Sequence, residues 1–344
     1  MGNKKVIILG IETSCDETAA AVVADGSVIL SSIAASQNEL HGRFGGVVPE
    51  IASRAHVERI LPVVAEAIEK AQIHPDQIDA VAVANQPGLS IALMVGVTAA
   101  KALAWAWQKP LIAVNHVHAH LQAAILDQDS IDLPAVALVV SGGHTLLYDV
   151  ESALDLRLLG STIDDAAGEA FDKVASILRL PYPGGPSIEK IAQEGNPRAI
   201  DFPRSLMEKN SLDFSFSGVK TAVLYYCQGQ DMKGENRVEK MSRQEIADIA
   251  ASFQAAVIDV LVEKTRRAVD KMKARTVLMG GGVAANGVLR KEMERFCQSR
   301  ALGLKVAPKP LCTDNAAMTA SLAYPKYQAG LFADLSLEPR ASLA

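Results

Sequence analysis

Val6-Ile7-Ile8-Leu9-Gly10-Ile11 and Thr18-Ala19-Ala20-Ala21-Val22-Val23-Ala24 are two apolar runs separated by a short polar turn. Short apolar runs bounded by polar turns are typical of buried β-strands. We therefore predict strands at residues 5–11, 18–24 and 27–34. After these we predict a helix within 49–71, a strand at 80–84, a helix within 89–107, a strand at 111–114 and a helix that ends near 126.

The same order of elements is predicted a second time after Leu133-Pro134. Strands at 135–140, 144–150 and 156–160 precede a helix from about 168, a long helix within 244–272, a strand at 276–279, a helix within 284–298, a strand near 304–307 and a last helix from about 314. A segment at about 180–243 is extra. The repeat predicts a duplicated α/β protein with two lobes, 1–133 and 134–313, a C-terminal helix, 314–344, that returns to the first lobe, and a cleft between the lobes. Ligands of such sheets bind beyond the strand ends.

The composition limits the class of protein. The 344 residues are 49% hydrophobic and only 5% aromatic, which suits parallel strands covered by helices. Lys101 interrupts the longest apolar run short of the roughly 18 residues that a membrane span needs, so we expect a cytoplasmic protein with no membrane partner. The four cysteines lack CxxC spacing, which predicts reduced thiols. A net charge of -5 argues against a generally basic nucleic-acid-binding surface. The basic run at 264–275 is either a solvated helix face or a polyanion footprint.

Three of the seven histidines lie in Asn115-His116-Val117-His118-Ala119-His120. Asn115 is a suitable N-cap after the strand at 111–114, and the residues that follow favour a helix. On a helix, His116 and His120 share a face and His118 points away. Two imidazoles one turn apart suit zinc or iron, and a pair of buried, hydrogen-bonded histidines is the alternative.

A metal at these histidines needs a carboxylate from elsewhere in the chain, because the positive end of the helix dipole disfavours a bare cation. Asp314, at the start of the last predicted helix, is our candidate, and N-capping is its alternative role. The His-Glu-x-x-His pattern of zinc proteases is absent, so a metalloprotease is not supported.

Polar turns join the first two predicted strands in both halves. Glu12-Thr13-Ser14-Cys15-Asp16-Glu17-Thr18 and Ser141-Gly142-Gly143-His144-Thr145 offer hydroxyls and unhindered backbone N–H groups of the kind that bind phosphate. Three acidic side chains in the first turn would repel phosphate, so that turn better suits a metal, water or a polar part of a ligand. Either turn alone has an ordinary structural role as its alternative.

Two further turns are candidates for ligand contact. Gly280-Gly281-Gly282 lets a ligand approach the backbone, although it matches neither the Walker nor the dinucleotide motif. Asn286 could then bond a ribose or base, or cap its own helix. In Pro183-Gly184-Gly185-Pro186 the backbone at Gly185 could lie against a ligand, with Asp172 accepting from ribose hydroxyls. The remaining histidines fit no cluster, and we expect surface or capping roles for them: His41, His56 and His74.

Together these motifs resemble the tRNA N6-adenosine threonylcarbamoyltransferase family of the bacterial TsaD type, over about residues 5–330. The resemblance rests on the two hairpin turns, the His116-x-x-x-His120 pair, Pro183-Gly184-Gly185-Pro186, and these further motifs: Gly45-Gly46-Val47-Val48-Pro49-Glu50-Ile51-Ala52-Ser53-Arg54, Phe214-Ser215-Phe216-Ser217-Gly218-Val219-Lys220-Thr221 and Gly280-Gly281-Gly282-Val283-Ala284-x-Asn286. His118 and Ala119 depart from the family, in which many bacterial members have Glu and Gly there. The departure leaves the ligand spacing unchanged.

The resemblance implies an actin-like, sugar-kinase and Hsp70-like fold. It implies transfer of threonylcarbamoyl from threonylcarbamoyl-AMP to N6 of adenosine 37 in tRNAs that read codons beginning with A, with release of AMP. It assigns one divalent metal ion, iron or zinc, to His116, His120 and Asp314. It assigns substrate contacts to Val139, Val140, Ser141, Gly142, Gly143, Asp172, Gly185, Glu189 and Asn286; some members have Asp at Glu189. AMP, ADP or ATP could occupy the same site. The general base stays unassigned, with Glu12 as a candidate.

The implied partners are tRNA, a TsaB-like paralogue that forms a heterodimer with the chain, a TsaE-like ATPase, and a TsaC-type enzyme that supplies threonylcarbamoyl-AMP. Two other functions fit the same fold. One is an ATP-dependent small-molecule kinase, which would not need the histidines. The other is a non-enzymatic ATP-binding scaffold.

Overall fold

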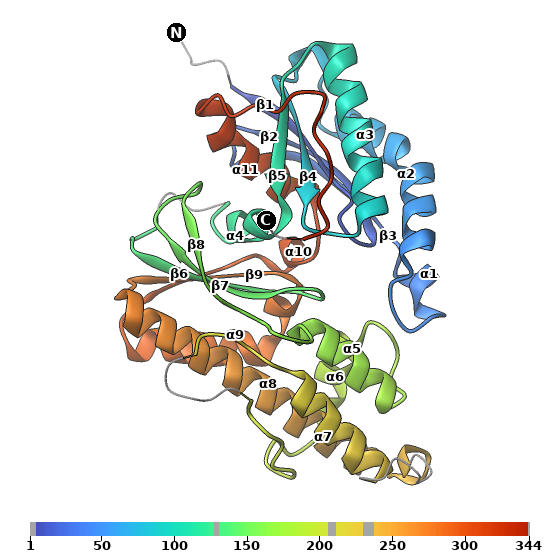
Figure 1. Ribbon diagram of the computed structural model, residues 1–344, viewed down its shortest axis with the longest axis vertical. Coiled ribbons are helices and arrows are strands. Elements are labelled where there is room, and N and C mark those ends of the chain that lie inside the picture. The colour runs from blue at the N-terminus through green and yellow to red at the C-terminus, as the bar shows by residue number, and fades with distance from the viewer. Residues whose placement is uncertain (1–4, 127–130, 206–210, 230–236, 343–344) are drawn as a thin grey trace. The chain divides into compact units, whose positions relative to one another are not determined.

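The computed structural model describes residues 5–126, 131–205, 211–229 and 237–342, which form two compact units (Figure 1). The first unit contains Met1–Ser130, Ser152–Asp155 and Ala307–Ala344. The second contains Ile131–Glu151 and Leu156–Val306. The C-terminal part of the chain therefore belongs to the same unit as the N-terminal part.

The first unit is built on a sheet with the order β3-β2-β1-β4-β5. Its strands are β1 (Ile7–Glu12), β2 (Glu17–Ala24), β3 (Val28–Ser36), β4 (Ala80–Gln86) and β5 (Leu111–Asn115). Antiparallel pairing joins β1, β2 and β3, whereas β1, β4 and β5 run parallel. Because the carboxyl ends of parallel strands share an edge, Glu12 and Asn115 end their strands at the same edge of the sheet.

Helices cover both faces of this sheet. On one face, α2 (Pro49–Lys70) and α3 (Ser90–Trp107) pack against side chains such as Leu9 and Ile11. On the other face lies α11 (Ala316–Gln328), whose backbone would meet a Cβ placed on Gly10 at 2.4 Å. The shorter elements of this unit are α1 (Asn38–Gly42), η1 (Pro75–Gln77), α4 (His116–Ala123) and α10 (Lys309–Cys312).

The second unit repeats the first sheet with the order β10-β9-β6-β7-β8. The strands are β6 (Ala135–Val140), β7 (Thr145–Val150), β8 (Leu156–Ser161), β9 (Thr276–Gly280) and β10 (Gly303–Val306). Again the first three strands are antiparallel neighbours, and β6, β9 and β10 are parallel. The predicted duplication is confirmed, strand for strand.

The helices of the second unit are α5 (Ala167–Ile177), α6 (Gly184–Ala192), α7 (Ser217–Gln228), α8 (Arg243–Met272) and α9 (Gly287–Ser299), with short 3₁₀ turns η2 (Arg237–Lys240) and η3 (Gly282–Ala285). The extra segment predicted at about 180–243 contains α6 and α7, and its parts 206–210 and 230–236 lie outside the described residues. The predicted helix within 284–298 begins only at Gly287, because the η3 turn precedes it.

By length and composition alone, α3 is the one helix among the described residues that could cross a membrane. Its packing has another explanation. It covers β4 and α2, and Gly96 lets it approach Thr13 so closely that an added Cβ would lie 2.4 Å from Oγ1. We interpret α3 as a helix that covers the sheet.

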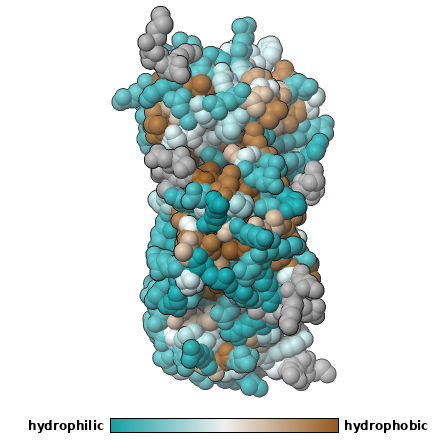
Figure 2. Space-filling model, turned by 90° about the vertical axis from the view of Figure 1, so that its left-hand side faces the viewer, coloured by the Kyte–Doolittle hydropathy of each residue, from teal (hydrophilic) through white to brown (hydrophobic). Residues whose placement is uncertain are grey.

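The surface is largely hydrophilic on the face that Figure 2 shows. Polar residues cover most of the face shown in Figure 2, and apolar residues interrupt them in smaller areas.

In the basic run at 264–275, Arg266 and Arg267 both pair with Glu263, and Lys264 is buried with its ammonium bonded to the Ser211 carbonyl. These pairs favour the helix face over the polyanion footprint, although Lys264 is buried and not solvated as predicted.

Candidate metal centre and nucleotide-binding turns

The metal candidate begins at the end of β5, where Asn115 turns the chain into α4. Its side-chain oxygen accepts a hydrogen bond from the His118 N–H at 3.1 Å, so the predicted N-cap is confirmed. One helical turn then places His116 and His120 on the same face, with ring centroids 4.7 Å apart. Both imidazoles are buried.

Asp314 supplies the carboxylate next to these rings. Its Oδ1 lies 3.1 Å from His120 Nε2 and 3.6 Å from His116 Nε2. It precedes α11 but does not cap it, because Asn315 takes that role by accepting from the Met318 N–H. The carboxylate of Asp314 is thereby left to face the histidines.

The three side chains fit a divalent metal ion. One ligand atom from each lies within 4.8 Å of the others. Two ligands about 2.1 Å from one ion at tetrahedral angles are about 3.4 Å apart, so small side-chain shifts suffice. Two neutral imidazoles and one carboxylate are ligands that zinc and iron accept, and three protein ligands leave a position open for a substrate.

Several carboxyl groups crowd around this group. Burial alone lowers the pKa of His116, but the carboxylates of Glu12 and Asp314 outweigh burial and raise it to about 9. Burial, reinforced by Asp314 and Asp16, raises the pKa of Glu17 to about 10. Crowded carboxylates of this kind are relieved by a bound cation.

His118 lies apart from this group, on another side of α4. Burial, together with the nearby ammonium of Lys326, lowers the pKa of His118 to about 4. The expectation that it points away from the pair is confirmed.

The remaining histidines test the prediction of surface or capping roles. His74 is exposed and caps η1, as predicted. The prediction is wrong for His41 and His56, which are fully buried. His56 Nε2–H donates to the Cys15 carbonyl at 2.9 Å, so its Nδ1 accepts from Thr18 at 2.8 Å. This bond ties α2 to the turn between β1 and β2.

The second unit carries the predicted substrate residues, beginning with the turn between β6 and β7. Val139 and Val140 end β6 with buried side chains, so only their backbone is available to a ligand. Ser141 is also buried, and its Oγ accepts from the His144 N–H. Gly142 and Gly143 are exposed, and a Cβ added to either would have no atom within 4 Å. This turn leaves room for a ligand against the backbone.

The two glycines at the start of α6 differ in the space around them: Gly184 is closely packed, and Gly185 has open space beside it. A Cβ on Gly184 would lie 2.5 Å from the Asp172 Cα, whereas a Cβ on Gly185 would meet nothing within 4 Å. Asp172 Oδ1 accepts from the Gly184 N–H at 2.7 Å. The carboxylate thus holds the turn and leaves the Gly185 backbone beside open space.

Asn286 is the N-cap of α9, since its Oδ1 accepts from two backbone N–H groups of the first turn at 3.0 Å each. Its amide donates to Gln254 at 2.8 Å, and Glu189 accepts from the Gly287 N–H at 2.8 Å. The capping alternative is therefore realised, and these side chains form one connected group at the start of α9.

Sequence reasoning missed the structural part played by Glu12. This carboxylate is fully buried and contacts His116 Nδ1 at 3.1 Å and the hydroxyl of Thr319 at 3.2 Å. The strand order could have found it, because β1 and β5 run parallel on either side of β4, so Glu12 at the end of β1 and His116 just after β5 lie at the same edge of the sheet.

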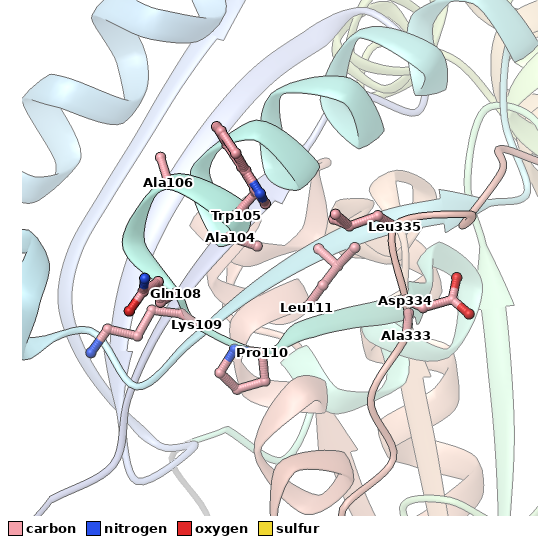
Figure 3. A pocket seen from close by; sticks show the side chains of 10 residues that line it. All are labelled: Ala104, Trp105, Ala106, Gln108, Lys109, Pro110, Leu111, Ala333, Asp334 and Leu335. Atoms are coloured by element: carbon pink, nitrogen blue, oxygen red, sulfur yellow. The ribbon is translucent and has the colours of Figure 1, made fainter.

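A surface pocket of the first unit shares no residue with the metal group. It lies where α3 ends and β5 begins (Figure 3), beside the chain at 333–335. Trp105 projects beside it and is 73% exposed. Its lining offers no imidazole or thiol, so it does not compete as the metal site.

Solved structures identify the fold class. The chain superposes on the (R)-2-hydroxyglutaryl-CoA dehydratase component A of Acidaminococcus fermentans with a TM-score of 0.55 at 15% identity, over 94% of this chain and 99% of that one. Its TM-score with HypF of T. kodakarensis is 0.60 at 13% identity, over 95% of this chain and 48% of that one. The chain is thus an α/β protein of the actin-like class, as predicted, with a candidate metal centre in one unit.

Sequence relatives identify the family. The family model for TsaD, tRNA N6-adenosine threonylcarbamoyltransferase, matches residues 28–321. A protein of that name from Moorella thermoacetica is 56% identical over 330 residues, which is 96% of this chain and 94% of that protein. Another from Symbiobacterium thermophilum is 52% identical over 336 residues, covering 98% and 96%. This chain belongs to the tRNA N6-adenosine threonylcarbamoyltransferase family and is a transferase. The kinase and scaffold alternatives are not favoured.

Proposed function

We propose that this chain transfers the threonylcarbamoyl group from threonylcarbamoyl-AMP to N6 of adenosine 37 in tRNAs that read codons beginning with A. The N6 amine forms a bond to the carbamoyl carbon, the bond from that carbon to the phosphate oxygen breaks, and AMP leaves as one amine proton is lost to solvent. The observation that carries the proposal is the His116, His120 and Asp314 group, found in a chain of this family.

In this proposal His116, His120 and Asp314 hold one divalent ion, iron or zinc, that binds the threonylcarbamoyl moiety. When bound, the ion supplies Lewis-acid polarisation of the carbonyl that the amine attacks. The chain's own contribution is to bury the two imidazoles and to hold them beside the Asp314 carboxylate, so that the three side chains would bind the ion together. Because the exocyclic amine of adenosine is a weak nucleophile, orientation of both substrates contributes much of the rate.

The adenylate part of the substrate would lie on the turns of the second unit. Support comes from the open space beside Gly142, Gly143 and Gly185, which a side chain at any of them would fill. The same proposal includes backbone contacts at Val139, Val140 and Ser141 and polar contacts at Asp172, Glu189 and Asn286. The last three already hold the backbone of α6 and α9, so they would present ligand and scaffold contacts together.

We further propose the partners that the family resemblance implies. These are a TsaB-like paralogue as heterodimer partner, a TsaE-like ATPase, and a TsaC-type enzyme that supplies threonylcarbamoyl-AMP in the cytoplasm. The net charge of -5 supports a share for these partners in holding the polyanionic tRNA.

The test is a transfer assay with purified chain, its partner proteins, threonylcarbamoyl-AMP labelled in the threonine and unmodified tRNA. We expect label in the tRNA, on adenosine 37 after digestion, and release of AMP. Two outcomes would refute the proposal: label that never reaches tRNA, or ATP-dependent phosphorylation of a small molecule as the only turnover.

A further inference from the structure

Glu12 is the last residue of β1. Its carboxylate is fully buried, and both of its oxygens accept hydrogen bonds. Its Oε1 accepts from the Ser14 N–H at 2.8 Å. Its Oε2 accepts from the Thr319 hydroxyl at 3.2 Å and from His116 Nδ1 at 3.1 Å. Three elements, β1, α4 and α11, therefore meet at this one side chain.

No lysine or arginine pairs with Glu12 among the residues that the structure describes, and its ionic partner there is the His116 ring. A buried carboxylate is costly unless it is paired and hydrogen-bonded. Glu12 is fully buried, whereas the other residues of β1 are apolar or glycine. An apolar residue would therefore be expected at this position as well. The pairing with His116 is thus the feature that accounts for an acid at this position.

The contact also determines which nitrogen of His116 carries a proton. An ionised carboxylate has no proton to donate and can only accept a hydrogen bond from the ring, so His116 Nδ1 carries the hydrogen. Ser14 Oγ lies 3.1 Å from the same nitrogen and can share this proton. The other nitrogen, Nε2, is the one that faces Asp314. His116 is therefore held in the orientation that a metal ligand needs, and loss of the Nε2 proton leaves the Nδ1–H tautomer.

His120 provides the contrast. Its Nε2 also faces Asp314, but its buried Nδ1 has no hydrogen-bond partner among the described side chains and backbone. Of the two imidazoles, only His116 has its outer nitrogen fixed by a carboxylate. The two histidines of this motif are therefore unequal, although their spacing makes them look equivalent.

We propose that Glu12 is a positioning residue that fixes the Nδ1–H tautomer and the ring orientation of His116, so that His116 is the preorganised ligand of the metal centre. Ser14 and Thr319 hold Glu12 in place for this task. The inference rests on the proposed metal site and assigns no proton transfer to Glu12. Loss of such an outer carboxylate typically lowers metal affinity about 10- to 100-fold.

The experiment measures zinc affinity of the full chain by competition with a chromogenic chelator, for the wild type, Glu12→Gln and Asp25→Asn. Asp25 is the matched control, because its carboxylate accepts from the Val6 N–H beside the opposite end of β1. We expect about 10- to 100-fold weaker zinc binding for Glu12→Gln and wild-type affinity for Asp25→Asn. Equal affinity of a folded Glu12→Gln protein and the wild type would overturn the inference.

A second measurement covers the case in which Glu12→Gln does not fold. Long-range ¹⁵N–¹H spectra of the zinc-loaded wild type report the state of each imidazole nitrogen. We expect His116 to carry its proton on Nδ1 and the metal on Nε2, and the reverse assignment would contradict the inference. A wild type that binds no zinc would refute the metal site itself, an outcome distinct from a site that binds zinc without help from Glu12.

Discussion

The turn between β1 and β2 and the turn between β6 and β7 occupy the same place in two sheets of the same strand order, yet they are built differently. The first is acidic and closed: Glu12 is buried, and Gly88 and Gly96 are pressed against Ser14 and Thr13. The second is open, because Gly142 and Gly143 have free space where side chains would be. One copy thus presents buried charged side chains, and the other presents exposed backbone.

This difference explains how a duplicated fold can serve one reaction with two kinds of contact. A metal requires fixed lone pairs, which buried and mutually bonded side chains supply. A nucleotide phosphate is bound well by backbone that has no side chains over it. Three changes to the chain and one pH titration test whether the two copies have these different roles.

The largest effect should follow from His116→Ala combined with His120→Ala. We expect loss of measurable zinc or iron binding, a fall of at least about 1,000-fold, since only one of three ligands remains. Metal content after dialysis, read by atomic emission, gives the result. His118→Ala is the control and should retain the metal, because His118 lies on another side of α4. A double variant that keeps its metal would place the site elsewhere.

The affinity of the His116, His120 and Asp314 site for metal should depend strongly on pH. The pKa of His116 is raised to about 9, so at neutral pH its imidazolium must lose a proton before Nε2 binds a metal. Below that pKa, apparent affinity should fall by up to about tenfold for each unit that the pH is lowered. Titrations at several pH values between about 6 and 8 measure the slope. Affinity that does not change across this range would be inconsistent with a protonated His116.

Gly143→Val should weaken nucleotide binding without destabilising the protein. A Cβ at this position meets no atom within 4 Å, so the fold tolerates it while the ligand space is filled. We expect AMP affinity to fall by about tenfold, which corresponds to about 1.4 kcal/mol of binding free energy. Calorimetric titration measures affinity and a thermal melt measures stability. Unchanged AMP affinity would remove this turn from the site.

Gly96→Ala should have the opposite effect: it should lower the stability of the protein and leave nucleotide binding unchanged. Its Cβ would lie 2.4 Å from Thr13 Oγ1, so either α3 or the Thr13 side chain, which bonds the Ala92 carbonyl, must shift. Overpacking of this kind typically costs about 1 to 3 kcal/mol. Urea denaturation should therefore show a lower midpoint, while AMP affinity stays at the wild-type value. A stable Gly96→Ala protein would mean that the first turn is less closely packed than its contacts indicate.

The sequence was informative where the pattern is local. Apolar runs with short polar turns predicted both sheets, and the spacing of His116 and His120 predicted a shared helix face. The bond between His120 and Asp314 joins residues 194 positions apart, and spacing cannot reveal such a contact. Asp314 was singled out only through its position in the predicted fold and the family resemblance.

The buried histidines also show that contacts between residues distant in sequence cannot be predicted from spacing. The sequence predicts a surface or capping role for His56 because it fits no cluster of candidate ligands. Its partners, Thr18 and the Cys15 carbonyl, come from the first hairpin, and only the folded sheet brings them to α2. Asn286 illustrates a different difficulty, since a helix cap and a ligand contact require the same residue type.

The most direct test of a metal-dependent transferase is the rate of threonylcarbamoyl transfer to tRNA by chain stripped of metal with a chelator, before and after zinc or ferrous iron is restored. The double variant His116→Ala and His120→Ala is measured in parallel. We predict that stripping abolishes transfer, that metal restores it to the wild type, and that the double variant is inactive in both conditions. Full transfer by the stripped protein, or by the double variant, would contradict the account.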